Sequence, residues 1–287
     1  MADALRQSGD LENALTAVRE SRRLQEQLPD GGETWRRANL ILAIWREGSI
    51  LAEDGDISLD RPQEAIPVFR HAVDLASELA DKDRDDTTHH QLGGEVARRL
   101  GDLLRRSDPQ AALAVFDQGI LRTREARSPN SSVKRTEAVL LARSSYVLRL
   151  VHRDDESRQR IDAAFRLLKD IGDYPATVIE PASEADLALR ALADHYAATS
   201  QPGKAVETYQ ELLVKLKGSE PDVQNDLRNA TYVSSACEAL ARILKQQGRL
   251  QEAASYNAER AGIWRNWDQK LPGNLFVRRQ LASVAAN

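Results

Sequence analysis

The sequence has little that would support disulfide, membrane or nucleic-acid chemistry. A single cysteine, Cys237, excludes an internal disulfide and fits a reducing compartment. No apolar run approaches the roughly 18 residues that a membrane-spanning helix needs, and charged residues are already spread through the first turns of the chain, unlike a secretory signal. A net charge of −4 leaves no basic excess for nucleic acid or an anionic membrane. We therefore expect a cytoplasmic chain with no nucleic-acid partner and no membrane contact of its own.

Common catalytic motifs are also missing. The chain has no Gly-x-Gly-x-x-Gly loop and no Asp-Phe-Gly, and the trio His152-Arg153-Asp154 lacks the downstream Asn of a kinase catalytic loop. Gly93-Gly94 is not followed by the Lys and Ser or Thr of a phosphate-binding loop. We expect no enzyme activity, no cofactor and no metal in this chain.

The remaining chemistry-bearing residues have simpler interpretations. His89 and His90 are adjacent, so on a helix they point about 100° apart and cannot ligate one metal from one face; we expect a solvated helix start. Cys237 shares a helix face with apolar residues, which predicts a buried thiol. His195 beside Asp194 leaves an undetected enzyme as the weakest alternative, because no nucleophile lies at a readable spacing.

Aromatic residues make up only 5% of the chain, whereas hydrophobic residues make up 41%, which favours helices rich in Ala and Leu. Small residues recur at intervals of 45 to 51 where two helices would cross, at Ala14, Ala65, Ala112, Ser157, Ala205 and Ala253. Small side chains let helix backbones approach closely, and a near-constant period is typical of a repeat architecture. The pattern predicts an all-α fold of stacked helix pairs. The alternative is an ordinary helical bundle with Ala-rich seams.

Two copies of the repeat are complete enough to resemble a known family. Each has a Leu, a small residue, an aromatic or Leu, a turn with Gly and then Ala, as in Leu192, Ala193, Tyr196, Gly203, Ala205 and in Leu240, Ala241, Leu244, Gly248, Ala253. This order resembles the tetratricopeptide repeat (TPR). The resemblance implies an α-α superhelical solenoid of TPR-like hairpins. The period exceeds the usual 34 or so residues, so we expect longer helices or longer loops between repeats.

We expect residues 1–287 to form a single array of about six helix pairs, the first one truncated, with a C-terminal capping helix at 274–287. The missing front half suggests that the chain is cut from, or mis-started within, a longer protein; the alternative is a short first helix. A break at 29–32 separates the first two pairs, and the turn at 55–62 is about five residues longer than in other copies. The helices are expected at 2–8, 11–28, 33–53, 63–79, 88–106, 109–126, 132–151, 156–171, 183–200, 203–216, 221–246, 250–270 and 274–286.

A second resemblance concerns the segments 33–38 and 267–274 and the Gly-Asp turns at 9–10 and 55–56. Together with the long second helices, they look like the C-terminal TPR region of bacterial serine/threonine protein kinases. This resemblance implies that a kinase domain, and usually a membrane segment, precedes such repeats in the parent polypeptide.

Binding in this architecture is expected on the concave face, which the first helix of each pair lines. Arg and aromatic residues dominate interface energetics, and those one turn from the crossing residue should point there. The predicted groove residues are Trp45, Ser49, Arg98, Asp102, Arg105, Tyr146, Arg149, Arg190, Asp194, Glu238, Arg242 and Lys245. We expect a non-catalytic scaffold that binds a protein or peptide, such as the interaction module of a signalling kinase. The alternative is a sensor that binds a small peptide or metabolite.

Overall fold

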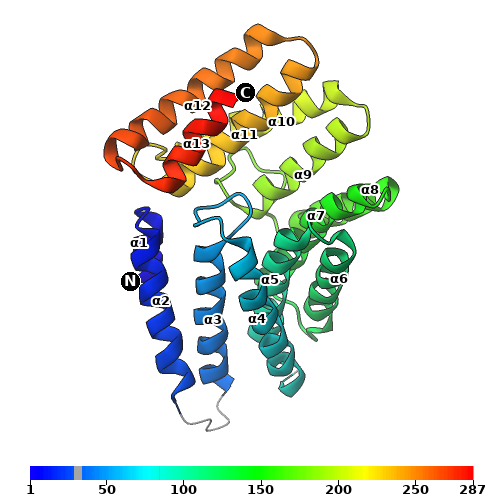
Figure 1. Ribbon diagram of the computed structural model, residues 1–287. Coiled ribbons are helices and arrows are strands. Elements are labelled where there is room, and N and C mark those ends of the chain that lie inside the picture. The colour runs from blue at the N-terminus through cyan, green and yellow to red at the C-terminus, as the bar shows by residue number, and fades with distance from the viewer. Residues whose placement is uncertain (29–33, 84, 287) are drawn as a thin grey trace.

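The fold is helical throughout the residues that the computed structural model describes, 1–28, 34–83 and 85–286. These residues form thirteen α-helices and no strand (Figure 1). In chain order they are α1 (Ala2–Gln7), α2 (Leu11–Glu26), α3 (Thr34–Leu51), α4 (Pro62–Lys82), α5 (Thr87–Leu104), α6 (Pro109–Glu125), α7 (Ser131–Leu150), α8 (Asp154–Asp170), α9 (Glu184–Ala198), α10 (Pro202–Gly218), α11 (Leu227–Gln246), α12 (Leu250–Lys270) and α13 (Leu275–Ala286).

Most helices begin and end within about three residues of the bounds expected from turn and capping signals. The start of α11 is the exception, because it lies at Leu227 rather than at 221. The carboxylate of Asp226 accepts hydrogen bonds from the backbone N–H groups of Arg228 and Asn229 at 2.8 and 3.0 Å and so caps the helix there. The expected break at 29–32 and the helix start at 33 lie outside the described residues.

The small residues of the repeat lie where the paired helices cross. All six are at most 4% exposed. In two pairs an aromatic ring from the second helix packs directly on a glycine of the first: a Cβ added to Gly101 would lie 2.6 Å from the ring of Phe116, and one added to Gly48 would lie 2.7 Å from the ring of Phe69. A side chain at either glycine would therefore push the helices apart, which explains why the seam uses small residues.

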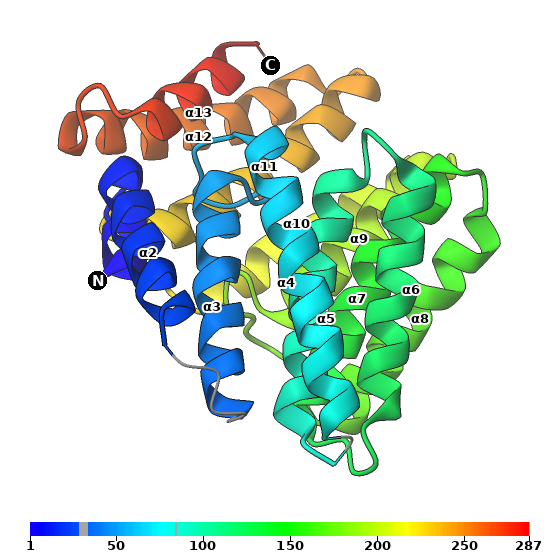
Figure 2. The ribbon, with the colours of Figure 1, turned by 60° about the horizontal axis from the view of Figure 1, so that its bottom comes forward.

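Every helix packs on the next one along the chain, from α1 to α13. Figure 2 shows this succession for α3, α4 and α5, which lie side by side. The first helices of the pairs also meet one another, since α5 contacts α7 and α7 contacts α9. They form the inner layer of the superhelix, and the buried apolar side chains between the layers make its core.

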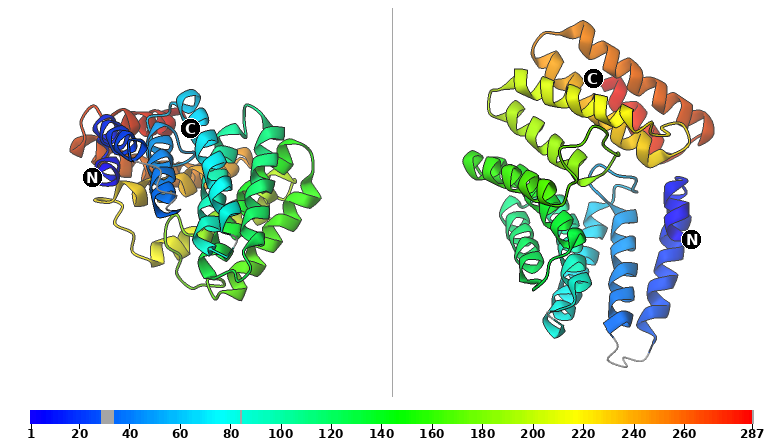
Figure 3. Two further views of the ribbon diagram at one scale, coloured as in Figure 1. Left: turned by 90° about the horizontal axis from the view of Figure 1, so that it is seen from below. Right: turned by 180° about the vertical axis from the view of Figure 1, so that it is seen from behind.

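The two ends of the helical succession meet. The side-chain amide of Asn274 donates to the backbone oxygen of Gly9 at 2.8 Å, and the Arg279 guanidinium donates to the backbone oxygen of Ser58 at 2.5 Å. Gly9 has a φ of +83°, and a Cβ there would lie 2.9 Å from a methyl group of Leu271, so the contact requires glycine. Figures 1 and 3 show α12 and α13 lying across the ends of α1 and α3. The superhelix thus closes on itself around an inner trough.

Candidate partner-binding trough

The trough is lined by the first helices of the pairs and by the α3–α4 loop at 52–61. The predicted groove residues lie on these helices, with Arg105 immediately after α5. The structure brings seven of them together around one cavity of about 230 Å³: Arg98, Arg105, Tyr146, Arg190, Asp194, Glu238 and Arg242. A second cavity of about 290 Å³ lies on the other side of the loop and also reaches Arg98. Whether these residues bind a partner stays a prediction.

Other predicted groove residues lie elsewhere or are covered. Ser49 is only 2% exposed, and the ring of half-buried Trp45 carries the Arg99 guanidinium at 4.1 Å from its centroid. Asp102 is buried beneath Arg98 and Arg143, at 3.3 and 2.8 Å. Lys245 is exposed near the end of α11. The three covered positions, Trp45, Ser49 and Asp102, therefore shape the trough more than they open onto it.

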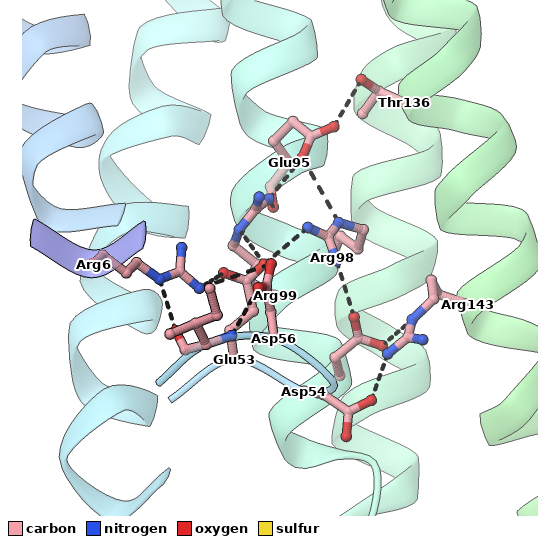
Figure 4. Close-up of polar contacts among 11 residues, drawn as sticks. Arg6, Glu53, Asp54, Asp56, Glu95, Arg98, Arg99, Thr136 and Arg143 are labelled. Carbon is pink, nitrogen blue, oxygen red and sulfur yellow. Dashed lines mark hydrogen bonds and ion pairs between the residues drawn. The ribbon is translucent and has the colours of Figure 1, made fainter. Parts of the chain in front are cut away.

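The α3–α4 loop brings carboxylates into the trough. Glu53 lies within 3.0 to 3.3 Å of three guanidinium groups, those of Arg6, Arg98 and Arg99 (Figure 4). Burial alone would raise the pKa of Glu53, but the three guanidinium groups outweigh it and hold the pKa well below its usual range. Asp56 behaves differently, since burial and the neighbouring Glu53 charge raise its pKa.

Asp54 extends this network to the next repeats. Its carboxylate contacts Arg105 at 3.0 Å, and it contacts Arg143 at 2.6 Å (Figure 4). Burial would raise the pKa of Asp54, and the Arg143 and Arg105 charges lower it instead. Because Arg143 also pairs with Asp102, and Asp102 with Arg98, the ion pairs run without a break across three repeats.

Sequence reasoning missed the acidic loop and its partners Arg6, Arg99 and Arg143. One signal was present, since the turn at 55–62 is longer than its counterparts. The extra residues are those that reach inward, because Ile57, Ser58 and Leu59 are each at most 9% exposed and anchor the loop inside the superhelix.

Two tyrosines and Asp194 form a hydrogen-bonded knot on the inner face. Tyr146 and Tyr209 donate their hydroxyl protons to the two oxygens of the Asp194 carboxylate, at 2.9 and 2.8 Å. Burial and the Asp194 charge raise the pKa of both tyrosines, so the hydroxyls stay protonated and keep donating.

Beyond this knot the trough opens into a wider pocket of about 640 Å³ between the C-terminal ends of α5, α7, α9 and α11. We call it the arginine pocket. Its lining residues are Arg105, Arg106, Tyr146, Arg149, Leu150, Asp194, Ala197, Ala198, Arg242, Ile243 and Gln246. The Arg149 guanidinium lies 4.5 Å from the Tyr146 ring centroid, within cation–π range. Burial, together with the neighbouring Arg105 charge, lowers the pKa of Arg149 by more than Tyr146 and the Asp194 charge raise it.

The other chemistry-bearing residues are buried. His89 and His90 are 5% and 0% exposed, so the expectation of a solvated helix start is wrong: His90 Nδ1 lies 2.7 Å from the backbone oxygen of Arg122, and this contact fixes the ring between α5 and α6. Cys237 is fully buried as expected, and burial raises its pKa to about 12. No group of His, Cys, Asp and Glu with metal-site geometry occurs in the described part of the chain.

His195 does acquire a hydroxyl neighbour. Its Nδ1 lies 3.2 Å from Oγ of Ser157, the small crossing residue of α8. Ser157 is fully buried and His195 is 5% exposed, whereas Asp194 engages the two tyrosines. This pair therefore fills a helix crossing and lacks the open cleft that a nucleophile needs.

None of the helices in the described part of the chain combines the length and the hydropathy of a membrane-spanning segment.

No family model and no curated protein sequence matches the chain. Several solved structures are similar to it, including the following two. BtubC (BKLC) from P. vanneervenii is 14% identical, with 88% of this chain and 90% of that chain covered and a TM-score of 0.59. The TPR-like repeats of a putative kinesin light chain from Podosopora anserina are 14% identical, with 82% of this chain and 98% of that chain covered and a TM-score of 0.50. The chain therefore has an all-α, TPR-like solenoid fold, as the repeat pattern predicted.

Proposed function

We propose that the chain is a non-catalytic scaffold that binds a peptide or protein segment in the open part of its trough, at the arginine pocket. The observation that carries this proposal is the pocket itself. It is about 640 Å³ in volume, opens between four stacked first helices and is lined by arginine and tyrosine side chains, which are enriched at binding hot spots. TPR-like folds suit protein interaction because their stacked first helices form an extended concave surface.

Site-specific photo-crosslinking tests this function. A benzophenone amino acid replaces Leu150, which is 52% exposed at the rim of the pocket, and in a matched variant it replaces Val214, which is 72% exposed on α10. We expect a discrete cross-linked partner band from the cell lysate with the Leu150 probe and none with the Val214 probe. Equal labelling from both positions, or from neither, would contradict the proposal.

The finer part of the proposal is that this scaffold is the interaction module of a larger bacterial signalling protein such as a serine/threonine kinase. It is supported by the sequence segments 33–38 and 267–274, which resemble the TPR region of such kinases. Reading the genomic frame upstream of Met1 tests it. An in-frame kinase domain is the expected result, and a stop codon directly before Met1 would overturn it.

A sensor that binds a small peptide or metabolite is the second candidate. The observation that favours it is the cavity of about 290 Å³ beside the α3–α4 loop, where Glu95, Arg98, Arg228 and Tyr232 offer several polar groups to one small ligand. A thermal-shift screen of small polar metabolites separates the two candidates. A compound that raises the melting temperature of the unaltered chain, but not that of the Tyr232→Phe variant, favours the sensor.

A further inference from the structure

The arginine pocket carries more positive charge than the residues around it neutralise. Four arginines line it, at 105, 106, 149 and 242. Arg105 is already paired with Asp54 at 3.0 Å, and Asp194 is the one carboxylate among the described lining residues. Both oxygens of Asp194 already accept hydrogen bonds from tyrosine hydroxyls, and the Arg242 guanidinium approaches only to 3.8 Å. The pocket therefore presents a surplus of guanidinium groups to solvent.

Arg149 is the centre of this surplus. In the described part of the chain no carboxylate lies within ion-pair distance of it, and its guanidinium is placed by the Tyr146 ring at 4.5 Å and by Oγ of Ser145 at 3.5 Å. These contacts fix the position of the charge without neutralising it. A half-buried cation that is held in place but unpaired is suited to an incoming anion, because little side-chain ordering remains to oppose binding.

The chemistry of the rim indicates what kind of anion fits. Leu150 is 52% exposed beside Arg149, and Ala197 and Ala198 add further apolar surface. The volume of about 640 Å³ far exceeds that of one carboxylate or phosphate group. Guanidinium groups next to apolar surface match a chain in which acidic and apolar side chains follow one another.

We propose that the arginine pocket binds an acidic peptide segment, with a side-chain carboxylate paired to the Arg149 guanidinium and an apolar neighbour resting on Leu150. This inference rests on the proposed scaffold function and specifies the chemistry of its partner. Because the whole chain carries a net charge of −4, the attraction is local and is screened over about 8 to 10 Å at ordinary salt concentrations. Affinity therefore falls as salt is added.

A fluorescence-anisotropy titration with defined peptides tests this proposal. The probe is a short labelled peptide of glutamates around a central leucine, with blocked ends, and the matched peptide has glutamine in place of each glutamate. We expect the glutamate peptide to bind about tenfold or more tightly than the glutamine peptide, which corresponds to one charge-assisted pair. Inorganic phosphate should displace it only in large excess; displacement by equimolar phosphate would indicate a small-anion site and overturn the proposal.

Variants of the full chain place the binding site. Arg149→Gln should weaken the glutamate peptide about tenfold, whereas Arg166→Gln, an exposed position on α8 with the same charge change, should leave it unaltered. Should Arg149→Gln fail to fold, Arg242→Gln replaces it, since the Arg242 side chain is 58% exposed. Equal effects of the pocket and control variants would overturn the proposal.

The outcome also separates this inference from the broader function. Binding of the glutamine peptide as tightly as the glutamate peptide, with a cross-linked partner at Leu150, would refute the acidic chemistry and leave the scaffold function standing. No binding of either peptide refutes the acidic segment, and the Leu150 photo-crosslinking result then decides on the scaffold function alone.

Discussion

The two halves of the trough use the same kind of arginine to opposite effect. On the N-terminal side, the α3–α4 loop brings Glu53 and Asp54 to the guanidinium groups of the inner helices, and each charge finds a partner within about 3 Å. On the C-terminal side no such loop reaches in among the residues that the structure describes, and Arg149 has an aromatic ring and a hydroxyl as its neighbours. An arginine on an inner helix thus stabilises the fold where the chain supplies a carboxylate, and it can pair with a ligand anion where the chain does not.

Removing the Glu53 carboxylate from the N-terminal side of the trough should have the largest effect on stability. Glu53→Gln leaves three guanidinium groups without their shared anion in a buried site, so we expect the free energy of unfolding to fall by about 3 to 5 kcal/mol. Urea denaturation measures it. Glu20→Gln is the control. The Glu20–Arg23 pair is more than half exposed on both sides, so this substitution should change stability far less than Glu53→Gln does. A fall in the free energy of unfolding of less than about 1 kcal/mol for Glu53→Gln would show that these charges do not stabilise the N-terminal side of the trough.

Acid should weaken the same half. The pKa values of Glu53, Asp54 and Glu95 are lowered in the folded chain, so their stabilising contribution is complete above the unfolded values of about 3.9 to 4.3 and is lost as the pH falls through the folded values. We expect the free energy of unfolding to drop by about 2 kcal/mol or more between pH 5 and pH 3. The Glu53→Gln variant should lose less over this interval. An identical pH slope in both proteins would contradict the assignment.

The raised pKa of Asp56 predicts the opposite sign for that carboxyl. A group whose pKa is higher in the folded chain than in the unfolded chain favours folding less as the pH rises through that range. Asp56→Asn keeps an oxygen that can accept the backbone N–H of Ile57, as Oδ1 of Asp56 does at 2.7 Å. We therefore expect a change in stability within about 1 kcal/mol at pH 7, far smaller than for Glu53→Gln. Chemical denaturation at pH 7 and pH 4 compares the two variants.

Breaking the ion pair between Asp54 and Arg105, where the two halves of the trough meet, should make one more guanidinium group available to a ligand. Asp54→Asn releases Arg105, which lines the arginine pocket, from its ion pair at 3.0 Å. We expect the affinity for an acidic peptide to rise about threefold, while stability falls by about 1 to 2 kcal/mol because Arg143 loses one of its partners. Anisotropy titration measures the affinity. A fall in affinity would mean that Asp54 supports the pocket instead of competing with its ligand.

A small effect is also expected where α13 holds the loop. Arg279→Gln removes the guanidinium that donates to the backbone oxygen of Ser58, and we expect a loss of about 0.5 to 1.5 kcal/mol. Hydrogen exchange should become faster at 52–61 and stay unchanged on α8. Faster exchange over the whole chain would show that this contact is part of the global fold and does not act on the loop alone.

The sequence predicted the helical succession because its signals are local. Small residues such as Ala112 and Ala205 recur at the crossings, Pro109 starts a helix, and Gly248 ends a turn, so each pair could be read on its own. The acidic loop could not be predicted in the same way. The pairing of Asp54 with Arg143 joins residues 89 positions apart, and no periodicity indicates which inner arginine a loop will reach.

The surroundings of the predicted groove residues could not be derived from the sequence for a related reason. Helical spacing placed Ser49 and Asp102 on the inner face, where they lie, but it could not indicate that the loop and neighbouring arginines would cover them. The repeat period gives the direction in which a side chain points. It does not give what lies in front of it.

The hydrogen bond from Asn274 to Gly9 joins residues 265 positions apart and has a mechanical consequence. An open solenoid behaves like a spring, in which each repeat contacts only its neighbours and can stretch or unravel from an end. Here the first turn and the last helix are joined by this hydrogen bond. Widening the trough to admit a larger ligand therefore requires the contact between Asn274 and Gly9 to break. We therefore expect an elastic stiffness closer to that of a ring, and unfolding as one cooperative event without fraying of the terminal pairs.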